Sequence, residues 1–145
     1  MFDDLPQFSY SLKFRQKAAK KIFSVDTGLA QAISLSFSED FGRVLENAVF
    51  SELRRRGGQL YYFKGLKSET DFVIKNQDES LQLIQVCWQI DDFKTKAREL
   101  GGLREAMRKF NTNRAVILTH ELDDEIEIDG QQIAVVPTWK WMLKK

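Results

Sequence analysis

The residues with the clearest chemical potential lie on two apolar segments that follow one another in the chain. In LQLIQVCW, Gln85 and Cys87, the only cysteine, share one face because strand side chains alternate. In DFVIK, the same alternation puts Asp71 and Lys75 on one face. If the two segments pair as strands, Asp71 lies near Gln85 and Cys87. Carboxylate and amide oxygens are groups that a hard divalent cation accepts as ligands, whereas a neutral thiol is not.

A second carboxylate, Glu46, lies on a helix upstream of these strands. It precedes Val49 and Phe50 by three and four residues, so it borders the apolar face of that helix. Because burying an unpaired charge is costly, Glu46 is expected to have a partner.

Structural roles compete with chemical ones at each of these positions. Gln85 could satisfy a buried partner such as Glu46 or a backbone group, and a lone buried Cys87 usually behaves as a small apolar residue. Asp71 follows the polar turn GLKSET, where an aspartate often caps the turn that starts a strand. Both sets of interpretations stay open at this point.

The pattern of apolar residues predicts a mixed α/β domain. A helix with Ser36 or Ser38 as its cap is expected to end at the Gly57-Gly58 pair. The other expected elements are a short strand at KIFSV, a brief helical stretch from about Leu29, strands at 59–64, 71–75 and 81–88, a helix after Asp92, a strand at 114–119, a hairpin turning at Asp129-Gly130, and a helical turn from Pro137.

Composition limits the classes of protein to which the chain can belong. At 145 residues, with 43% hydrophobic and 30% charged residues, it predicts one compact globular domain. A net charge of +1 gives no global attraction for nucleic acid or for a membrane surface. One cysteine and one histidine exclude an intramolecular disulfide and a zinc cluster. With no signal-peptide pattern and no apolar run of membrane length, a cytoplasmic location is expected and a membrane partner is not.

The order of helix, three strands, helix and strand, with a helix glutamate and a strand aspartate, resembles the restriction-endonuclease-like PD-(D/E)XK nuclease core. The segments KIFSVDTGL, GRVLENAVFSELRRRG, ETDFVI, LIQVCW and IAVVPTWKWML resemble the domain of unknown function 4143, the C-terminal domain of archaeal and bacterial AAA-type ATPases. The resemblance implies an α/β fold with a mixed central sheet flanked by helices, followed by a C-terminal hairpin and a short helix.

The same resemblance divides the chain. FSYSLKFRQKAAKK resembles the junction that follows an ATPase part, so residues 1–20 are a lead-in and residues 21–145 a single nuclease-like domain. No phosphate-binding loop motif occurs, so no ATPase domain is expected in this chain, which is then a fragment or a stand-alone relative.

Carried over residue by residue, the resemblance makes Glu46, Asp71 and Gln85 the metal-ligand positions, with Mg2+ as the cofactor if the site is active. Cys87 stands where the nuclease lysine belongs. The pattern has therefore lost an anion at Gln85 and a cation at Cys87, and both matter for metal-assisted hydrolysis. Lys75, or Lys64 on the neighbouring strand, is the candidate replacement for the missing lysine.

Three functions follow as expectations. The leading one is a nuclease-like domain without catalytic activity that serves as a regulatory module binding nucleic acid or protein. The alternative is a weak Mg2+-dependent nuclease, favoured if Glu46, Asp71 and a lysine amine converge within about 5 Å. A structural dimerisation domain is the third, with the aromatic lead-in residues Phe2, Phe8, Tyr10 and Phe14 either forming an exposed patch or covering the core.

A basic patch is the candidate nucleic-acid surface. It would combine the helix-end run Arg54, Arg55 and Arg56 with Lys94, Arg98, Arg104, Arg108 and Lys109 on the second helix. The same residues equally describe the solvated faces of two amphipathic helices. His120 has no recognisable nucleophile beside it, so a structural role is expected there.

Overall fold

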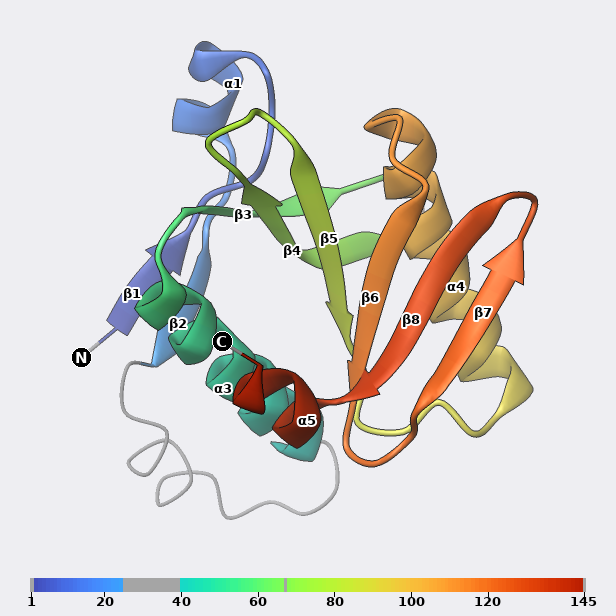
Figure 1. Cartoon of the computed structure of the whole chain (residues 1–145). Helices are drawn as coiled ribbons and strands as arrows, with labels where there is room; N and C mark the ends of the chain where they lie inside the picture. The colour runs from blue at the N-terminus through green and yellow to red at the C-terminus, as the bar shows by residue number, and fades with distance from the viewer. Residues whose placement is uncertain (1, 25–39, 67, 145) are drawn as a thin grey trace.

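The computed structural model describes residues 2–24, 40–66 and 68–144 (Figure 1). In chain order the elements are β1 Phe2–Leu5, α1 Leu12–Lys17, β2 Lys21–Ser24, α3 Asp40–Arg56, β3 Gln59–Lys64, β4 Glu69–Lys75, β5 Leu81–Val86, α4 Phe93–Lys109, β6 Arg114–Thr119, β7 Asp124–Ile128, β8 Gln131–Pro137 and α5 Thr138–Leu143. None of the helices within these ranges has the length and hydropathy of a membrane span.

A mixed six-stranded sheet in the order β3-β4-β5-β6-β8-β7 forms the centre of the molecule. Strands β3 to β5 form an antiparallel meander, β5, β6 and β8 run parallel, and β7 returns antiparallel to β8. The parallel pair β5 and β6 needs a crossover connection, which α4 supplies.

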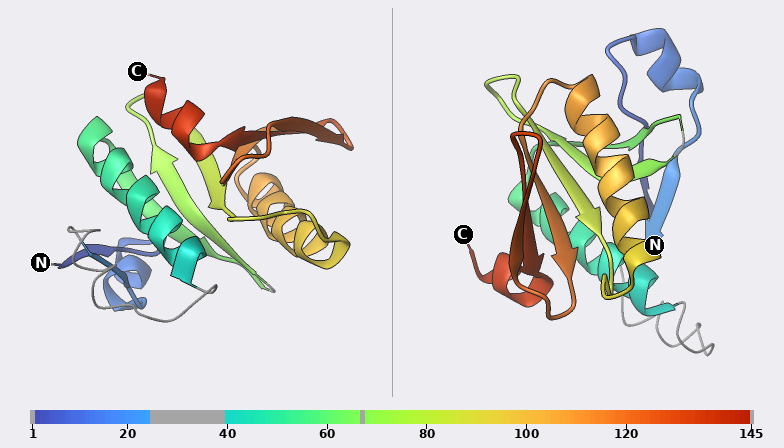
Figure 2. Two further views of the ribbon diagram at one scale, coloured as in Figure 1. Left: turned by 90° about the horizontal axis from the view of Figure 1, so that it is seen from below. Right: turned by 90° about the vertical axis from the view of Figure 1, so that its right-hand side faces the viewer.

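Two apolar layers hold the helices on opposite faces of this sheet (Figure 2). On one face, Leu103 and Met107 of α4 pack with Val73, Leu83 and Ile117. On the other, α3 packs against the sheet together with α5 and the small β1-β2 sheet; the buried side chains here include Val49, Phe50, Leu53, Leu5, Phe23, Phe72 and Ile84. The prediction of a mixed central sheet flanked by helices is confirmed.

Local signals in the sequence found many of the element boundaries. Strands β3 and β6 have the expected bounds, and α3 ends at Arg56, before Gly57 and Gly58 with φ of 79° and 107°. The Asp129-Gly130 turn has positive φ at both residues, as a tight hairpin requires. The expected helical stretch from Leu29 and the caps Ser36 and Ser38 lie outside the described residues.

The N-terminal part has more regular structure than expected, so the full element order differs from the simple nuclease-like order. β1 pairs antiparallel with β2, and α1 lies between them. Between β1 and α1, the chain runs along the edge of β3. There the Tyr62 amide donates to the Pro6 carbonyl (3.0 Å), and the Phe8 amide donates to the Tyr62 carbonyl (2.7 Å). Phe8 is buried and covers the core, whereas Phe2, Tyr10 and Phe14 are exposed.

Two strands of the central sheet differ from their expected bounds. Strand β4 begins at Glu69, two residues before the expected start, and β5 ends at Val86, two residues before the expected end.

Gly102 lets α4 pack closely against the turn before β4. A Cβ at Gly102 would lie 2.5 Å from Ser68 Oγ and 2.9 Å from Ser68 Cβ, whereas a Cβ at Gly101 would meet no atom within 4 Å. We therefore expect Gly102→Ala to lower the free energy of unfolding by about 1–2 kcal/mol through overpacking. The matched Gly101→Ala is expected to raise it by about 0.5–1 kcal/mol, because alanine favours a helix. Urea denaturation of the two variants measures these changes. If both variants changed the free energy of unfolding in the same direction and by a similar amount, the close approach of Gly102 to Ser68 would be contradicted.

Candidate functional site

A β-bulge in β4 determines where Asp71 points. The β3-β4 register pairs Phe63 with Thr70 and Tyr61 with Val73, so Tyr62 lies opposite both Asp71 and Phe72. A bulge of this kind interrupts the alternation of side chains. Asp71 therefore lies on the α3 side of the sheet, while Val73 packs on the α4 side. The expectation that Asp71 shares a face with Lys75 is wrong for this reason.

On the α3 side, three carboxylates surround the amine of Lys21, which begins β2. The Lys21 Nζ lies 2.5 Å from Glu69 Oε1, 3.0 Å from Glu46 Oε1 and 3.3 Å from Asp71 Oδ1. The side chains of Lys21 and Glu46 are each 24% exposed, and that of Asp71 is 11% exposed. The expected partner of Glu46 is thus Lys21, and we call Lys21, Glu46, Glu69 and Asp71 the carboxylate cluster.

The backbone and the neighbouring rings fix the position of Lys21. The Asn47 side chain of α3 accepts from the Ser24 amide (2.9 Å) and donates to the Ser24 carbonyl (2.7 Å), which fastens β2 to the helix. The Lys21 Nζ lies 5.6 Å from the centre of the Tyr62 ring, and the Tyr62 hydroxyl donates to the Ala19 carbonyl at 2.7 Å. An ammonium over an aromatic face is electrostatically favourable. The amine is therefore held in place from several sides.

Burial and charge act in opposite directions within the carboxylate cluster. Burial lowers the pKa of Lys21, but the charges of Asp71, Glu46 and Glu69 outweigh this and raise it above its usual value. Burial and the charge of Glu46 raise the pKa of Asp71 to about 7, although Lys21 and the Val86 amide act to lower it. The raised pKa of Lys21 and the raised pKa of Asp71 are compatible, because Lys21 has other carboxylate partners and stays charged when Asp71 takes up a proton.

Gln85 and Asp71 replace main-chain pairing where β4 and β5 separate. The regular register ends at Phe72 opposite Ile84. Beyond it, the Asp71 amide donates to Gln85 Oε1 (3.2 Å), and the Val86 amide donates to Asp71 Oδ2 (2.9 Å). Buried amides need such acceptors. Gln85 therefore satisfies a backbone group, which is one of the structural roles expected for it.

Cys87 lies on the other side of the sheet from the carboxylate cluster, within the apolar layer against α4. Its thiol donates to the Gln89 carbonyl at 2.9 Å, and burial raises its pKa to about 11. Since the thiolate is the reactive form, we expect the folded protein to react roughly 100-fold more slowly with an aromatic disulfide reagent at pH 8 than the urea-unfolded chain. Equal rates in the two states would contradict this burial.

The lysines expected near Asp71 lie elsewhere. Lys75 pairs with Glu79 across the β4-β5 turn, with Nζ and Oε2 2.7 Å apart. Lys64 ends β3 and is exposed. Lys21, which no pattern in the sequence indicated, is the lysine that contacts Glu46 and Asp71.

The donor atoms of the carboxylate cluster fit a divalent cation poorly. Both Asp71 oxygens and the Gln85 side-chain oxygen already accept hydrogen bonds. The Lys21 ammonium lies at the point where the carboxylates converge. Within the described residues, no group of three or more His, Cys, Asp or Glu side chains is arranged to hold a metal ion.

The expected basic patch is divided between the two faces of the sheet, because α3 and α4 cover opposite faces (Figure 2). Five of its six arginines, Arg54, Arg55, Arg56, Arg98 and Arg104, form ion pairs, and Arg108 lies near the end of α4. Hydrogen bonds from the neighbouring arginines of α3 lower the pKa of Glu52 to about 2. Arg56 also donates to the Trp141 carbonyl at 3.0 Å and so joins α3 to α5. These contacts give the arginines structural partners.

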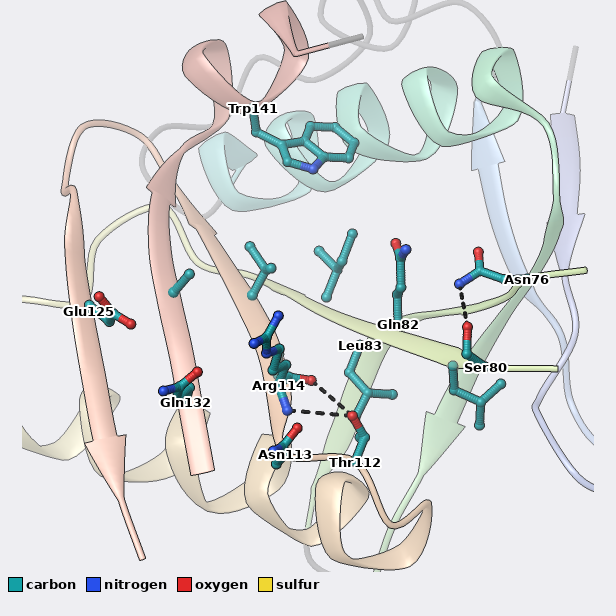
Figure 3. Close-up of a pocket in the computed structure, with 15 residues that line it drawn as sticks. Asn76, Ser80, Gln82, Leu83, Thr112, Asn113, Arg114, Glu125, Gln132 and Trp141 are labelled. Atoms are coloured by element: carbon teal, nitrogen blue, oxygen red, sulfur yellow. Dashed lines mark hydrogen bonds between the residues drawn. The ribbon is translucent and has the colours of Figure 1, made fainter. Parts of the chain in front are cut away.

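A groove lies away from the carboxylate cluster, on the part of the α3 face that the helices leave open (Figure 3). Its volume is about 620 Å³, and it crosses β5, β6, β8 and β7. Its lining includes Gln82, Arg114, Glu125, Gln132 and Trp141. The groove holds no group of acids and bases comparable to the carboxylate cluster, so we assign the candidate site to the cluster.

Three contributors to the site were missed in the sequence: Lys21, Glu69 and Tyr62. Glu69 precedes Asp71 by two residues, so strand alternation alone would have put the two on one face. Lys21 opens KIFSVDTGL, one of the segments that carries the family resemblance. Nothing local indicates that β2 lies against β4.

Comparison with known proteins gives the family but no activity. Residues 41–141 match the family described as "Domain of unknown function (DUF4143)". An uncharacterized protein of Methanocaldococcus jannaschii is 35% identical over 145 residues, which cover 93% of this chain and 32% of that protein. An uncharacterized protein of Haemophilus influenzae is 28% identical over 139 residues, which cover 96% of this chain and 33% of that protein.

The chain spans about a third of the length of these relatives. No solved structure matches it. The family match includes the α3 glutamate and both β4 acids of the carboxylate cluster, and on the extent of that match the chain belongs to the DUF4143 family.

Proposed function

We propose that the chain is a PD-(D/E)XK nuclease-like domain that has lost metal-dependent hydrolysis and serves as a binding or regulatory module of AAA-type ATPases. The run α3-β3-β4-β5-α4-β6, with Glu46 on the helix and Asp71 on the second strand, supports the nuclease-like assignment. The length of the relatives, about three times that of the matched region, leaves room for an ATPase part.

The contact of the Lys21 ammonium with Glu46, Glu69 and Asp71 carries the proposal. In metal-assisted hydrolysis, a cation held by carboxylates polarises the phosphate and lowers the pKa of the attacking water. An ammonium can neutralise the same carboxylates, but it has no vacant coordination position for water or phosphate. The lysine therefore stabilises the acids in place of a metal and leaves them without metal chemistry.

The role of Gln85 and Cys87 agrees with this proposal. Gln85 accepts from a backbone amide, and Cys87 packs in the apolar layer against α4. Neither side chain supplies the charge that the nuclease pattern has at that position. Both are then structural residues of the strand.

A protein segment is the partner that the surface favours over nucleic acid. The net charge is +1, and the arginines of α3 and α4 lie on opposite faces, mostly in ion pairs. Phosphate recognition depends on several cations that converge on one strand or groove. We therefore propose a protein-binding module.

A weak Mg2+-dependent nuclease is the second candidate, because one observation favours it. The Lys21 Nζ lies 3.0 Å from Glu46 and 3.3 Å from Asp71, which is the convergence that a relocated lysine would need. In this alternative Lys21 has to release the carboxylates before a metal ion can enter.

Cleavage assays separate the two candidates. Wild type and Asp71→Ala are incubated with single- and double-stranded DNA and with RNA, in Mg2+ or Mn2+. We expect no cleavage above the level of Asp71→Ala. Metal-dependent cleavage by the wild type that disappears in Asp71→Ala would favour the nuclease and refute the module without activity.

A further inference from the structure

The two edges of the six-stranded sheet differ in their cover. At the β3 edge, the chain's own residues 6–8 hydrogen-bond to Tyr62. At the other edge, β7 pairs with β8 on one side only, and no other described segment pairs with its outer side (Figure 1). A free edge presents unpaired N–H and C=O groups that can receive another strand.

From Glu125 to Ile128, side chains of β7 alternate between acidic and apolar. Glu125 and Glu127 are exposed and lie opposite Ala134 and Gln132 of β8, on the groove side of the sheet. Glu125 lines the groove beside Gln132 (Figure 3). On the other side, Ile126 and Ile128 are partly buried against the core layer of α4.

The two glutamates are available for a partner. In the part of the chain that the structure describes, neither Glu125 nor Glu127 is in an ion pair. The acids just outside the strand are occupied, since Asp123 pairs with Lys140 and Asp129 pairs with Arg104. The free negative charge of this edge is therefore concentrated on the strand itself.

This pattern selects among occupants. A second copy of β7 would bring glutamates close to glutamates, and like charges facing across strands are destabilising. A strand with lysine or arginine at alternate positions would instead extend these side chains beside Glu125 and Glu127. Apolar residues at the intervening positions would continue the surface of Ile126 and Ile128.

We infer that β7 binds an extended protein segment in which basic and apolar residues alternate, added as a further strand of the sheet. This inference rests on the proposed function only in giving the protein-binding module its surface. It does not depend on whether the carboxylate cluster is catalytic. The cleavage assays can therefore refute the proposed function without refuting the binding at β7, and the peptide assay can do the reverse.

The probe is a fluorescently labelled peptide of alternating lysine and valine, measured by fluorescence anisotropy with the whole chain. A peptide of the same composition with lysines and valines in separate blocks controls for charge alone. Two further peptides carry N-methyl groups on either all valines or all lysines. One of these two is expected to lose binding, because one set of amides faces β7 in a strand pair. Equal binding by the blocked peptide, or no loss with either methylated peptide, would overturn the inference.

Charge reversal locates the surface. Glu125→Lys/Glu127→Lys is expected to weaken binding of the lysine-valine peptide by roughly tenfold or more. The same variant is expected to gain binding of a glutamate-valine peptide. Glu79→Lys/Asp91→Lys changes the net charge equally at exposed positions away from β7 and is expected to leave the affinity within about twofold. Equal weakening in the two variants, or no binding of either peptide by the wild type, would overturn the inference. So would a dimer in sedimentation that Glu125→Lys/Glu127→Lys abolishes, because a second copy would then occupy the edge.

Discussion

Replacing Lys21 by methionine is expected to lower the free energy of unfolding by about 2–4 kcal/mol at pH 8. The substitution keeps an apolar side chain of similar length but leaves Glu46, Glu69 and Asp71 facing one another without a cation. Removing one partner of a buried ion pair costs several kcal/mol, and partial exposure of this cluster reduces that cost. Urea denaturation monitored by tryptophan fluorescence measures the change.

Lys20→Met is the matched control for this prediction. Lys20 precedes Lys21 in the chain and pairs with Asp4, but both side chains are almost half exposed. Exposed pairs contribute little, so the loss is expected to be below about 1 kcal/mol. A loss as large as that of Lys21→Met would mean that the carboxylate cluster has no special role in stability.

The cost of Lys21→Met is expected to be smaller at pH 5 than at pH 8. Because the pKa of Asp71 is raised to about 7 in the folded state, the folded protein holds more protons at Asp71 than the unfolded chain between about pH 4 and 7. The stability contributed by Asp71 therefore falls as pH rises through this window. At pH 5 Asp71 is protonated and repels its neighbours less, so the missing ammonium matters less. The same cost at both pH values would contradict the raised pKa.

The pKa of Lys21 acts in a different window. It is raised above its usual value, so the stabilisation that it contributes is complete below about pH 10 and is lost only at higher pH. The difference between pH 5 and pH 8 thus reports on the carboxylates and not on the lysine.

Asp71→Ala is expected to lower the free energy of unfolding by about 2–3 kcal/mol at pH 5. At this pH the aspartate carries its proton, so the variant chiefly removes the acceptor of the Val86 amide in a buried position. Asp71→Asn keeps an oxygen at this position and is expected to lose less than about 1 kcal/mol.

Amide hydrogen exchange at Val86 tests the reason for this difference. Exchange is expected to be faster in Asp71→Ala than in the wild type and close to the wild-type rate in Asp71→Asn. An unchanged rate in Asp71→Ala would mean that another group accepts from this amide, and the proposed role of Asp71 in joining β4 and β5 would be wrong.

Local patterns in the sequence predicted most of the central domain. Alternation and apolar runs identified β3 and β6 with their observed bounds, and the glycine pair identified the end of α3. Glu46, a carboxylate at the apolar border of a helix, was expected to need a partner, and it has one in Lys21. These features depend on residues that are close in sequence.

The site itself depends on contacts that local patterns do not contain. β1 and β2 have only four residues each, and their pairing joins segments on either side of α1. The bulge in β4 arises from its register with β3, and it reverses the face on which Asp71 lies. Lys21 therefore meets Asp71 through two features of strand pairing that neither segment shows alone.

The basic patch illustrates the same limit at the level of layers. The sequence placed arginines on the outer faces of two helices, as an amphipathic pattern allows. Whether those helices share a face of the sheet depends on strand order and on the crossover between β5 and β6. Here they cover opposite faces, so the patch does not converge.

We infer that the lysine of the carboxylate cluster takes the place of a divalent metal. The most direct test is calorimetric titration of Mn2+ into the wild type at pH 7.5, with Asp71→Ala titrated under the same conditions. We expect no saturable binding that distinguishes the two proteins. Saturable binding by the wild type that Asp71→Ala abolishes would contradict it, because Lys21 would then yield its carboxylates to a metal ion.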